Sequence, residues 1–588
     1  MKNNKFKTGI MAGFAMVLGS CALQPTSATT AATGSSGTPP FTIDQGKQWT
    51  ANARKSFYVQ DQGSQIMPLS WIQALKLQDG TPFLSGSLNR YGYLPNDHSP
   101  TPGLPVGFTT NGGGSDKSIG LTCAACHTRQ IEVAGTPYRI DGGPAIVNFQ
   151  SFLSDLDTAV DTILKDEATF NSFANTVLGS ASTPAKVKKL HDDVSAWFLR
   201  YDTLMKAALP STPWGPSRLD AVTMIFNRLT GLDIGPPPSY MIAANIKRAD
   251  VPVRYPFLWN APIQDKTQWP GFADNGDKIL GLSRNLGEVF GVFATFHPKK
   301  DPNRVLGVDY LAVNSANFSG LEKLEDLIEK LGPPKWPWPV DKTLAAKGKD
   351  IYEKTCAAGC HEIKKGEFRS LTHITWATPL QDVGTDSREY DVLAGMVDTG
   401  VLNGAGIPFL DDPLKPKDTA FHVLGLAVGA SIIQQAESML SGGGKMSTKD
   451  KLKMKLKKAF LRPGLEHLGS LKGAFKTPAA KTTAEPFKYE SRVLEGIWAT
   501  APYLHNGSVP TLAELLKPAA ERAASFKIGP AYDTTNLGLA VEQTKFDYTL
   551  NTTGCDQRNS GNSRCGHEFG TKLSTEDKKA LLEYLKIL

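Results

Sequence analysis

The sequence predicts a mainly α-helical protein of two domains, with long loops between the helices and few short strands. Three observations support this prediction. Apolar residues recur at helical spacing in several stretches of the chain. A pair of cysteines followed at once by a histidine occurs once in each half of the chain. A proline-rich segment separates these two motifs, and 588 residues are more than a single core usually accommodates.

The composition is that of an ordinary globular protein, with 40% apolar and 21% charged residues. The formal net charge is only +7. Much of this charge lies in one run of lysines, which comprises Lys445, Lys449, Lys451, Lys453, Lys455, Lys457 and Lys458. Nucleic-acid binding needs a basic face rather than one short run. We therefore expect no nucleic-acid partner.

Residues 1–21 have the pattern of a bacterial export signal. Lysines precede the apolar run 9–18, which is too short to anchor the chain permanently in a bilayer. The sequence Leu-Gly-Ser-Cys that ends at Cys21 resembles the lipoprotein cleavage box, in which the cysteine carries a lipid anchor after cleavage. The alternative is cleavage near residues 26–32, which would remove Cys21. Residues 22–40 are rich in Thr, Ser, Ala, Gly and Pro, and predict a flexible tether.

The first cysteine motif lies in the predicted N-terminal domain, residues 41–332. Its spacing, Cys123-Ala-Ala-Cys126-His127, is typical of covalent c-type haem attachment. Each thiol adds to one vinyl group of the porphyrin, and the histidine becomes the proximal ligand of the iron. One alternative is a pair of buried thiols beside a surface histidine. A zinc site is a weaker alternative, because it needs a second pair of ligands.

The N-terminal domain is expected to combine helices with long loops. Residues 41–120 mix aromatic residues with turn formers, which predicts loops wrapped over a core. Apolar residues at helical spacing predict helices over 149–173 and 184–208. Another helix is predicted over 281–293. Residues 254–271 are dense in aromatic residues and broken by prolines, so we expect them to be extended or looped.

Three residues of this domain are candidates for a role in the chemistry. Trp259 and Trp269 either pack in the core or lie near the haem edges, where they would influence electron movement. Arg284 either pairs with a haem propionate as a bidentate donor or forms a surface salt bridge.

A proline-rich linker, 333–340, precedes the second predicted domain, 341–588. Residues 413–479 have the character of an insertion, with a helix predicted over 420–439 and the lysine run behind it. Such a run is usually a solvated face, and a docking patch for an acidic redox partner is the alternative. The last predicted helix covers 575–588.

The second cysteine motif follows a helix predicted over 341–354. Here three residues instead of two separate Cys356 from Cys360, and His361 follows directly. Gly359 tolerates the backbone dihedrals that an extra residue requires, so the ligand geometry is preserved. We therefore expect a second covalent haem at Cys356, Cys360 and His361. The alternative is one thioether bond or none.

The remaining cysteines indicate an oxidising compartment. Once Cys21 is lipid-modified or removed and four cysteines hold haem, Cys555 and Cys565 remain for a disulfide. Bacteria also attach haem to c-type motifs outside the cytoplasmic membrane. Both arguments predict an exported protein, in the periplasm, anchored at the outer membrane, or outside the cell.

The run that begins at Ala501, Ala-Pro-Tyr-Leu-His-Asn-Gly-Ser-Val-Pro-Thr-Leu, follows two c-type motifs. This arrangement resembles the bacterial di-haem cytochrome c peroxidase superfamily. The runs Gly-Leu-Thr-Cys-Ala-Ala-Cys-His-Thr, Tyr-Pro-Phe-Leu-Trp-Asn-Ala-Pro and Gly-Asn-Ser-Arg-Cys-Gly-His-Glu-Phe-Gly are similar to its branch of secreted, RoxA-like rubber oxygenases. The resemblance implies two mainly helical, cytochrome-c-like haem domains, two covalently bound haems c, and oxygen or peroxide chemistry at the N-terminal haem. The wider gap between Cys356 and Cys360 departs from the usual motif of that branch.

The sixth ligand of the C-terminal haem is expected to be a histidine. Methionine often fills this position in cytochromes c, but the last methionine is Met454, inside the lysine-rich insertion. His505 and His567 are then the candidates. Resemblance to the rubber-oxygenase branch implies His567 as the ligand, and resemblance to the peroxidases gives His505 a place near a propionate.

Two hypotheses of different class follow. In the first, the protein is an enzyme that uses O2 or H2O2, with an apolar organic substrate or a small electron-donor protein as its partner. In the second, both irons are saturated and the protein only transfers electrons in the periplasm. The distal ligand of the first haem stays open at this point, with His98, His191 and His297 available.

Overall fold

The computed structural model describes residues 39–112, 117–362, 375–408, 412–440 and 487–588. The predicted export signal, nearly all of the tether and the lysine run lie outside the described residues. From Pro40 to Leu588 the chain forms one unit by its internal contacts. The division into domains at 333–340 stays a prediction.

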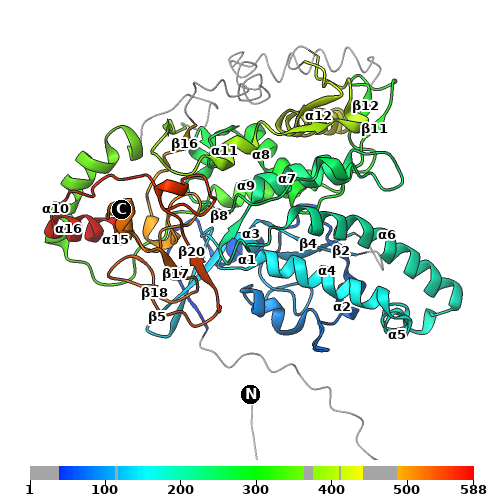
Figure 1. The fold of residues 1–588 in the computed structure, drawn as a ribbon, viewed down its shortest axis with the longest axis horizontal. Helices are drawn as coiled ribbons and strands as arrows, with labels where there is room; N and C mark the ends of the chain where they lie inside the picture. Colours follow the sequence, from blue (N-terminus) through cyan, green and yellow to red (C-terminus); the bar gives the residue numbers. More distant parts are fainter. Residues whose placement is uncertain (1–38, 113–116, 363–374, 409–411, 441–486) are drawn as a thin grey trace, which may run out of the picture. The chain divides into compact units, whose positions relative to one another are not determined.

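Helices dominate the regular structure, as predicted (Figure 1). The described helices are α1 (Ala51–Val59), α2 (Leu69–Ala74), α3 (Cys123–Cys126), α4 (Phe149–Lys165), α5 (Glu167–Leu178), α6 (Pro184–Ala208), α7 (Ala221–Phe226), α8 (Lys278–Gly291), α9 (Phe318–Ile328), α10 (Lys342–Tyr352), α11 (Arg388–Val392), α12 (Ala420–Leu440), α15 (Leu512–Leu515) and α16 (Thr575–Leu585). Among the described residues, none of these helices is both long and apolar enough to cross a membrane.

The strands are short, and most pair two by two. Two sheets of three strands are described, one in the order β1 (Phe41–Thr42), β6 (Thr136–Asp141), β5 (Thr128–Val133), and one in the order β2 (Met67–Pro68), β4 (Ser118–Leu121), β3 (Phe108–Asn111). The paired strands are β7 (Arg218–Leu219) with β8 (Val253–Arg254), β9 (Lys266–Thr267) with β10 (Ala273–Asp274), β11 (Lys299–Lys300) with β12 (Val308–Asp309), β13 (Leu380–Gln381) with β16 (Tyr489–Glu490), β14 (Met396–Asp398) with β15 (Lys417–Thr419), β17 (Ser525–Lys527) with β20 (Thr549–Asn551), and β18 (Tyr532–Asp533) with β19 (Gly538–Leu539).

The helix predicted over 149–173 is divided into α4 and α5 at Asp166. This residue ends α4 in an extended conformation, and its carboxylate accepts the backbone N–H of Thr169 at 2.7 Å. An aspartate in this position satisfies one of the free N–H groups at a helix start. The helix predicted over 184–208 is α6, where Thr183 provides the N-cap and a proline follows at the first helical position.

The other helix predictions agree with the structure within a few residues. The helix expected over 281–293 is α8, and the helix expected over 420–439 is α12. The terminal helix α16 ends at Leu585, three residues before the predicted end. Residues 254–271 contain the end of β8, the strand β9 and a single 3-10 turn, so they are looped as expected.

The proline-rich segment 333–340 packs tightly against the C-terminal part of the chain. The ring of Trp498 lies 5.2 Å from that of Trp336 and 5.9 Å from that of Trp338, measured between centroids. The Trp498 indole donates to the carbonyl of Pro334 at 3.0 Å. These edge-to-face aromatic contacts and the satisfied indole N–H fix this segment in one conformation.

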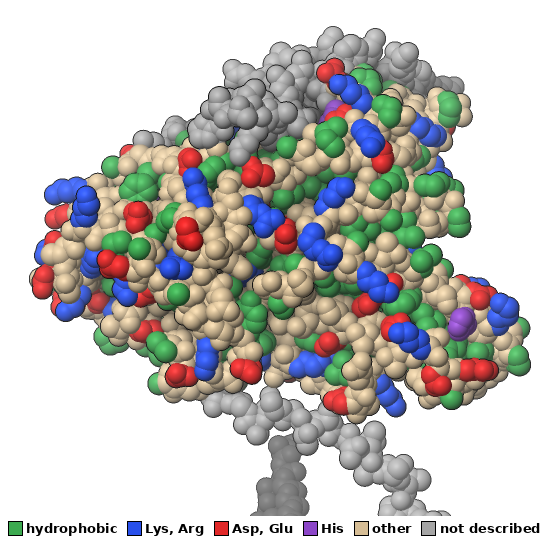
Figure 2. Space-filling view, in the orientation of Figure 1, with side chains coloured by type: hydrophobic (Ala, Val, Ile, Leu, Met, Phe, Trp, Pro, Cys, Tyr) green, Lys and Arg blue, Asp and Glu red, His purple; other side chains and the backbone are tan. Residues whose placement is uncertain are grey.

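Two helices that frame the second cysteine motif, α10 and α16, lie side by side (Figure 1). A Cβ atom on Gly348 of α10 would lie 1.9 Å from the carbonyl oxygen of Ala580 in α16, so only glycine permits this approach. On the face shown in Figure 2, basic and acidic side chains are interspersed.

Candidate haem sites

The first motif is held in place by a short helix and a hairpin. Helix α3 provides one turn that contains both cysteines, and the backbone N–H of His127 closes it by donating to the Cys123 carbonyl at 2.9 Å. Strand β5 begins directly after His127, and the carbonyl of His127 accepts the N–H of Gly142 at 2.8 Å. Two thiols and an imidazole are thereby fixed on a single turn.

The hydrogen bond and the burial of the His127 ring favour metal binding. Its Nδ1 lies 2.8 Å from the carbonyl oxygen of Pro256. A carbonyl only accepts, so Nδ1 carries the proton and Nε2 is left with a free lone pair. Burial lowers the pKa of His127 to about 4, which keeps the ring neutral at pH 7. A carbonyl partner of this kind fixes the orientation of a ligating histidine.

The second motif repeats this arrangement despite its extra residue. The motif ends a distorted helical segment, η7 (Glu353–His361), in which Gly359 has a φ of 78°. Only glycine adopts this left-handed conformation at little cost, which accommodates the third intervening residue. The Nδ1 of His361 lies 2.7 Å from the carbonyl oxygen of Arg492, so here too Nε2 is free.

A histidine faces His361 across the second site. The ring centroids of His361 and His567 are 6.3 Å apart. A metal ion placed between two imidazoles, with bonds of about 2 Å to each nitrogen, separates the centroids by about 6 Å. Burial lowers the pKa of His567 to about 3, and Nδ1 of this ring is buried without a hydrogen-bond partner in the described residues. The pair therefore fits an iron with two histidine ligands.

The cavity at the second site also suits a porphyrin. It contains Cys356, Cys360 and both histidines, and most of its remaining wall is apolar: Val383, Leu494, Ile497, Leu512, Leu515, Leu516, Phe569, Leu581 and Leu585. An apolar wall with a few convergent polar groups is typical of a cofactor site. In the part of the chain that the structure describes, no three His, Cys, Asp or Glu side chains group to hold a metal ion. A haem iron takes four of its ligands from the porphyrin, so two histidines suffice.

Four buried arginines group around Arg254, and we call them the arginine cluster: Arg129, Arg218, Arg254 and Arg492. Two of them, Arg218 and Arg254, lie near His505. Among the described residues, only Arg492 forms an ion pair, with Glu490 at 2.8 Å. Nε and one terminal nitrogen of both Arg129 and Arg218 are buried without partners. Burial lowers the pKa of Arg254 to about 9.

Buried guanidinium groups without anions are costly, so the arginine cluster implies an anionic group that binds there. Haem propionates are carboxylates, which arginine binds with paired hydrogen bonds. The cluster therefore fits the propionates of the predicted haems. His505 stacks on Tyr489 at 4.2 Å, and its pKa is lowered to about 3 by burial and by the charges of Arg254 and Arg218. His505 thus lies beside the arginine cluster, where we expect a propionate, and the ring that faces His361 is that of His567.

Arg284 is paired inside the chain, not at the surface. Its guanidinium donates to the carboxylate of Glu325 and to the amide oxygens of Asn275 and Asn285. Both charged side chains of the pair are about 8% exposed. The surface salt bridge that the sequence suggested is thus a buried one, because a guanidinium beneath helix α9 needs a carboxylate partner. The guanidinium is already engaged by these partners, which does not favour the alternative role of binding a haem propionate.

Glu288 was not singled out from the sequence, yet it lies at the first site. It follows Arg284 by one turn of α8. Burial raises the pKa of both motif thiols, Cys123 and Cys126, and the charge of Glu288 raises it further. Gln268 donates to its carboxylate at 2.9 Å. Burial raises the pKa of Glu288, so it keeps a proton more readily than a surface glutamate. An Arg and a Glu four residues apart within an apolar helix is the signal that would have indicated it.

The two tryptophans occupy different parts of the core. Trp259 stacks on Phe257 with centroids 4.8 Å apart, in a hydrophobic cluster that also contains residues of both cysteine motifs. Trp269 lies under the guanidinium of Arg254, which is 4.8 Å from its ring. Trp259 therefore belongs to the core that both sites share, and Trp269 lies against the arginine cluster. Their role in the chemistry stays a prediction.

The three histidines proposed as distal ligands of the first haem make other contacts. His98 is exposed, His191 is exposed and packs its ring on Phe170, and His297 stacks on Tyr240 with centroids 3.8 Å apart. Among the described residues, the ring paired with His127 is that of Tyr255, not a histidine. The two sites therefore differ: the second has an opposed histidine and the first has none in the described chain.

Cys555 and Cys565 form a disulfide. The four motif cysteines are free thiols in the chain, as haem attachment requires.

Comparison with known proteins agrees with a cytochrome. A family model described as RoxA-like, cytochrome c-like matches residues 488–527, which include Arg492 and a large part of the second cavity wall. The uncharacterized protein y4iJ of Sinorhizobium fredii is 29% identical, over 92% of each chain. The uncharacterized protein y4iM of the same organism is 26% identical, over 53% of this chain and 56% of that protein. The family match supports the RoxA-like branch and suggests haem c as the cofactor.

His567→Ala is expected to convert one low-spin haem to high-spin, because it removes the ring that faces His361. The absorption spectrum of the purified oxidised protein measures this change. His505→Ala is the control, since it also removes a histidine near the second site, but one that stacks on Tyr489. If His505→Ala changes the spin state and His567→Ala does not, the assignment of the ligand is wrong.

Proposed function

We propose that this chain is an exported di-haem c-type cytochrome oxidoreductase. In this proposal, oxygen or peroxide reacts at the haem of Cys123, Cys126 and His127, and the haem of Cys356, Cys360 and His361 stores or supplies an electron. The match to a RoxA-like, cytochrome c-like family supports a haem oxidoreductase in general. The observation that carries the finer proposal is the difference between the two sites: His567 faces His361, and no described histidine faces His127.

The chemistry of a haem depends on whether its distal position is open. A bound haem supplies an iron that takes up O2 or H2O2 where no protein ligand fills that position. With His567 opposite His361, the second site suits electron storage. At the first site no described histidine fills the distal position, so a small molecule can bind there. This site therefore suits the reaction with an oxidant.

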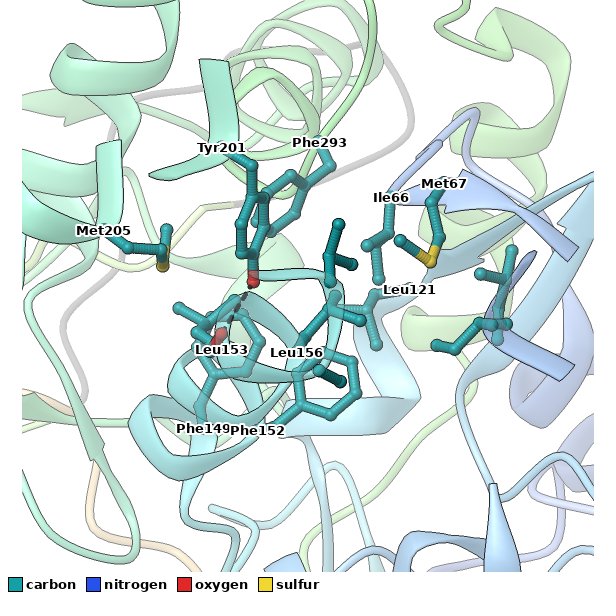
Figure 3. Close-up of a cluster of buried hydrophobic side chains, with 14 of the residues drawn as sticks. Ile66, Met67, Leu121, Phe149, Phe152, Leu153, Leu156, Tyr201, Met205 and Phe293 are labelled. Carbon is teal, nitrogen blue, oxygen red and sulfur yellow. Dashed lines mark hydrogen bonds between the residues drawn. The ribbon is translucent and has the colours of Figure 1, made fainter. Parts of the chain in front are cut away.

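The residues around the first motif favour an apolar substrate. Cys126 packs against a hydrophobic cluster that includes Ile66, Met67, Leu121 and Phe293. Figure 3 shows these four side chains with Tyr201 and the apolar face of α4, where the Tyr201 hydroxyl donates to the Leu153 carbonyl at 3.0 Å. Such surroundings exclude water and admit apolar molecules. We therefore favour an oxygenase that acts on an apolar organic substrate.

A second candidate function is a peroxidase with a small electron-donor protein as its partner. The observation that favours it is the buried pair of Arg284 and Glu288 near the motif thiols. Glu288 is positioned to hold a proton for an oxygen atom that is being reduced, and Arg284 supplies a nearby positive charge.

The proposal includes export from the cytoplasm. It rests on the signal-like residues 1–21, on the disulfide between Cys555 and Cys565, and on c-type haem attachment. We also propose Cys21 as a lipid attachment site that holds the mature protein at a membrane surface in the periplasm or on the outer membrane.

Two assays of the purified protein distinguish the candidate functions. One combines hydrogen peroxide with a reduced electron donor, and the other combines dioxygen with polyisoprene. We expect cleavage of the polymer, because the first site is surrounded by apolar side chains. Peroxide turnover alone would favour the peroxidase. Inertness in both assays together with reversible redox cycling would contradict the enzyme and leave electron transfer as the function.

Glu288→Gln is expected to lower the turnover rate with O2 or H2O2, whichever the protein uses, by about 100-fold. The reason is that it removes a proton donor at the first site. Activity of the unmutated protein should fall as the pH rises through the raised pKa of Glu288, and the variant should lose this limb of the pH profile. Glu322→Gln, an exposed change on the neighbouring helix α9, is the control. An unchanged rate and an unchanged pH profile in Glu288→Gln would rule out this role.

A further inference from the structure

A continuous path of covalent bonds and hydrogen bonds connects the proximal histidines of the two sites. His127 Nδ1 donates to the carbonyl of Pro256 at 2.8 Å. The next residue, Phe257, accepts a hydrogen bond at its own carbonyl from Nη2 of Arg492, at 2.9 Å. The carbonyl of Arg492 accepts the bond from His361 Nδ1 at 2.7 Å. Three hydrogen bonds, the backbone from the Pro256 carbonyl to the Phe257 carbonyl, and one arginine thus join the two rings.

We infer that this connection, the Arg492 bridge, is the route by which electrons pass between the two haems. The inference rests on the proposed function, since it requires a haem at each end. Nothing in the sequence motifs assigns a role to Arg492, which lies 131 residues after His361 in the chain.

The geometry of the bridge is fixed on every side. Arg492 is 5% exposed, and its guanidinium lies 4.4 Å from the centre of the Phe257 ring. Its Nη1 donates to Glu490 at 2.8 Å, and Glu490 belongs to β16, which pairs with β13. Phe257 is fully buried and stacks on Trp259. A side chain held by an ion pair, a ring and a carbonyl keeps one rotamer, so the contact to Phe257 is constant.

Such a bridge favours electron transfer for a simple reason. Electrons tunnel more readily through covalent and hydrogen bonds than across an equal empty distance. One electron crosses in each event, so that one iron is oxidised and the other is reduced. No bond forms or breaks, and no proton has to move. The external reductant is a small electron donor, for which the photogenerated reductant substitutes in the experiment below.

Arg492 also acts on the ligands at the two ends. Its carbonyl orients the ring of His361. Its guanidinium holds the carbonyl of Phe257, the residue after Pro256, whose carbonyl orients the ring of His127. A hydrogen bond of this kind raises the basicity of a ligating histidine. Arg492 is thus a positioning residue for both sites, not a group that touches substrate.

The chain offers a closely matched control in Arg228. This residue is also buried, donates from Nη2 to a backbone carbonyl (Ala294, 3.2 Å), lies over a phenylalanine ring (Phe293, 4.9 Å) and has a carboxylate neighbour, Asp233. It is not part of the bridge. Replacement by lysine therefore perturbs the core at Arg228 and Arg492 in a similar way, but breaks the bridge only at Arg492.

The experiment is a flash photoreduction of the oxidised full-length protein by one electron. Absorbance then follows the redistribution of the electron between the high-spin and the low-spin haem. In Arg492→Lys the rate is expected to fall about tenfold, since a lysine ammonium cannot replace the fork of the guanidinium that contacts both Glu490 and the Phe257 carbonyl. In Arg228→Lys the rate is expected to stay within about twofold of the unmutated protein. If Arg492→Lys holds less haem, Glu490→Gln, which frees the guanidinium, is measured instead and is expected to slow transfer several-fold.

The outcomes separate this inference from the proposed function. Two haem additions in the intact mass, together with an unchanged rate in Arg492→Lys or Glu490→Gln, would overturn the bridge alone. Equal slowing in Arg228→Lys would also overturn it, because the effect would then belong to the core in general. A single haem addition in the unmutated protein would overturn the proposed function and the bridge together.

Discussion

The hydrogen bonds from His127 and His361 to backbone carbonyls are the interactions on which the rest of this structure depends. Each bond leaves Nε2 as the free nitrogen and fixes the plane of its ring. The acceptors, Pro256 and Arg492, lie in segments far from the motifs in sequence. The loop after β8 and the loop after β16 must therefore be held in place before either motif can present a ligand. The stacked rings of Phe257 and Trp259 and the guanidinium of Arg492 over Phe257 contribute to this.

The arginine cluster shows how closely folding and cofactor are linked. Leaving one buried charge without its partner costs about 3–5 kcal/mol. Arg129 and Arg218 have buried nitrogens with no partner among the described residues, so the chain by itself carries such a cost. A bound haem would supply carboxylates to these groups. Cofactor binding and core stability are therefore expected to rise and fall together.

Local signals in the sequence were enough to predict the helices and the haem motifs. They were not enough to predict which distant residues contact the motif side chains. Apolar spacing located α4, α6, α8 and α12, because each buries one face. The dependence of His361 on a carbonyl at Arg492 has no local signal, since it arises from the packing of distant loops. Glu288 had a local signal, its spacing from Arg284 in an apolar helix, but its closeness to the motif thiols arises only from the fold. The sequence left Arg284 between a haem propionate and a surface salt bridge, because its partner, Glu325, belongs to another helix and no periodicity connects the two.

The difference between the two sites is the central claim of this account. Low-temperature electron paramagnetic resonance of the fully oxidised protein tests it most directly. The account predicts one high-spin ferric signal, from the haem at His127, and one low-spin ferric signal in equal amount, from the haem between His361 and His567. Two low-spin signals would contradict an open first site, and two high-spin signals would contradict the histidine pair at the second.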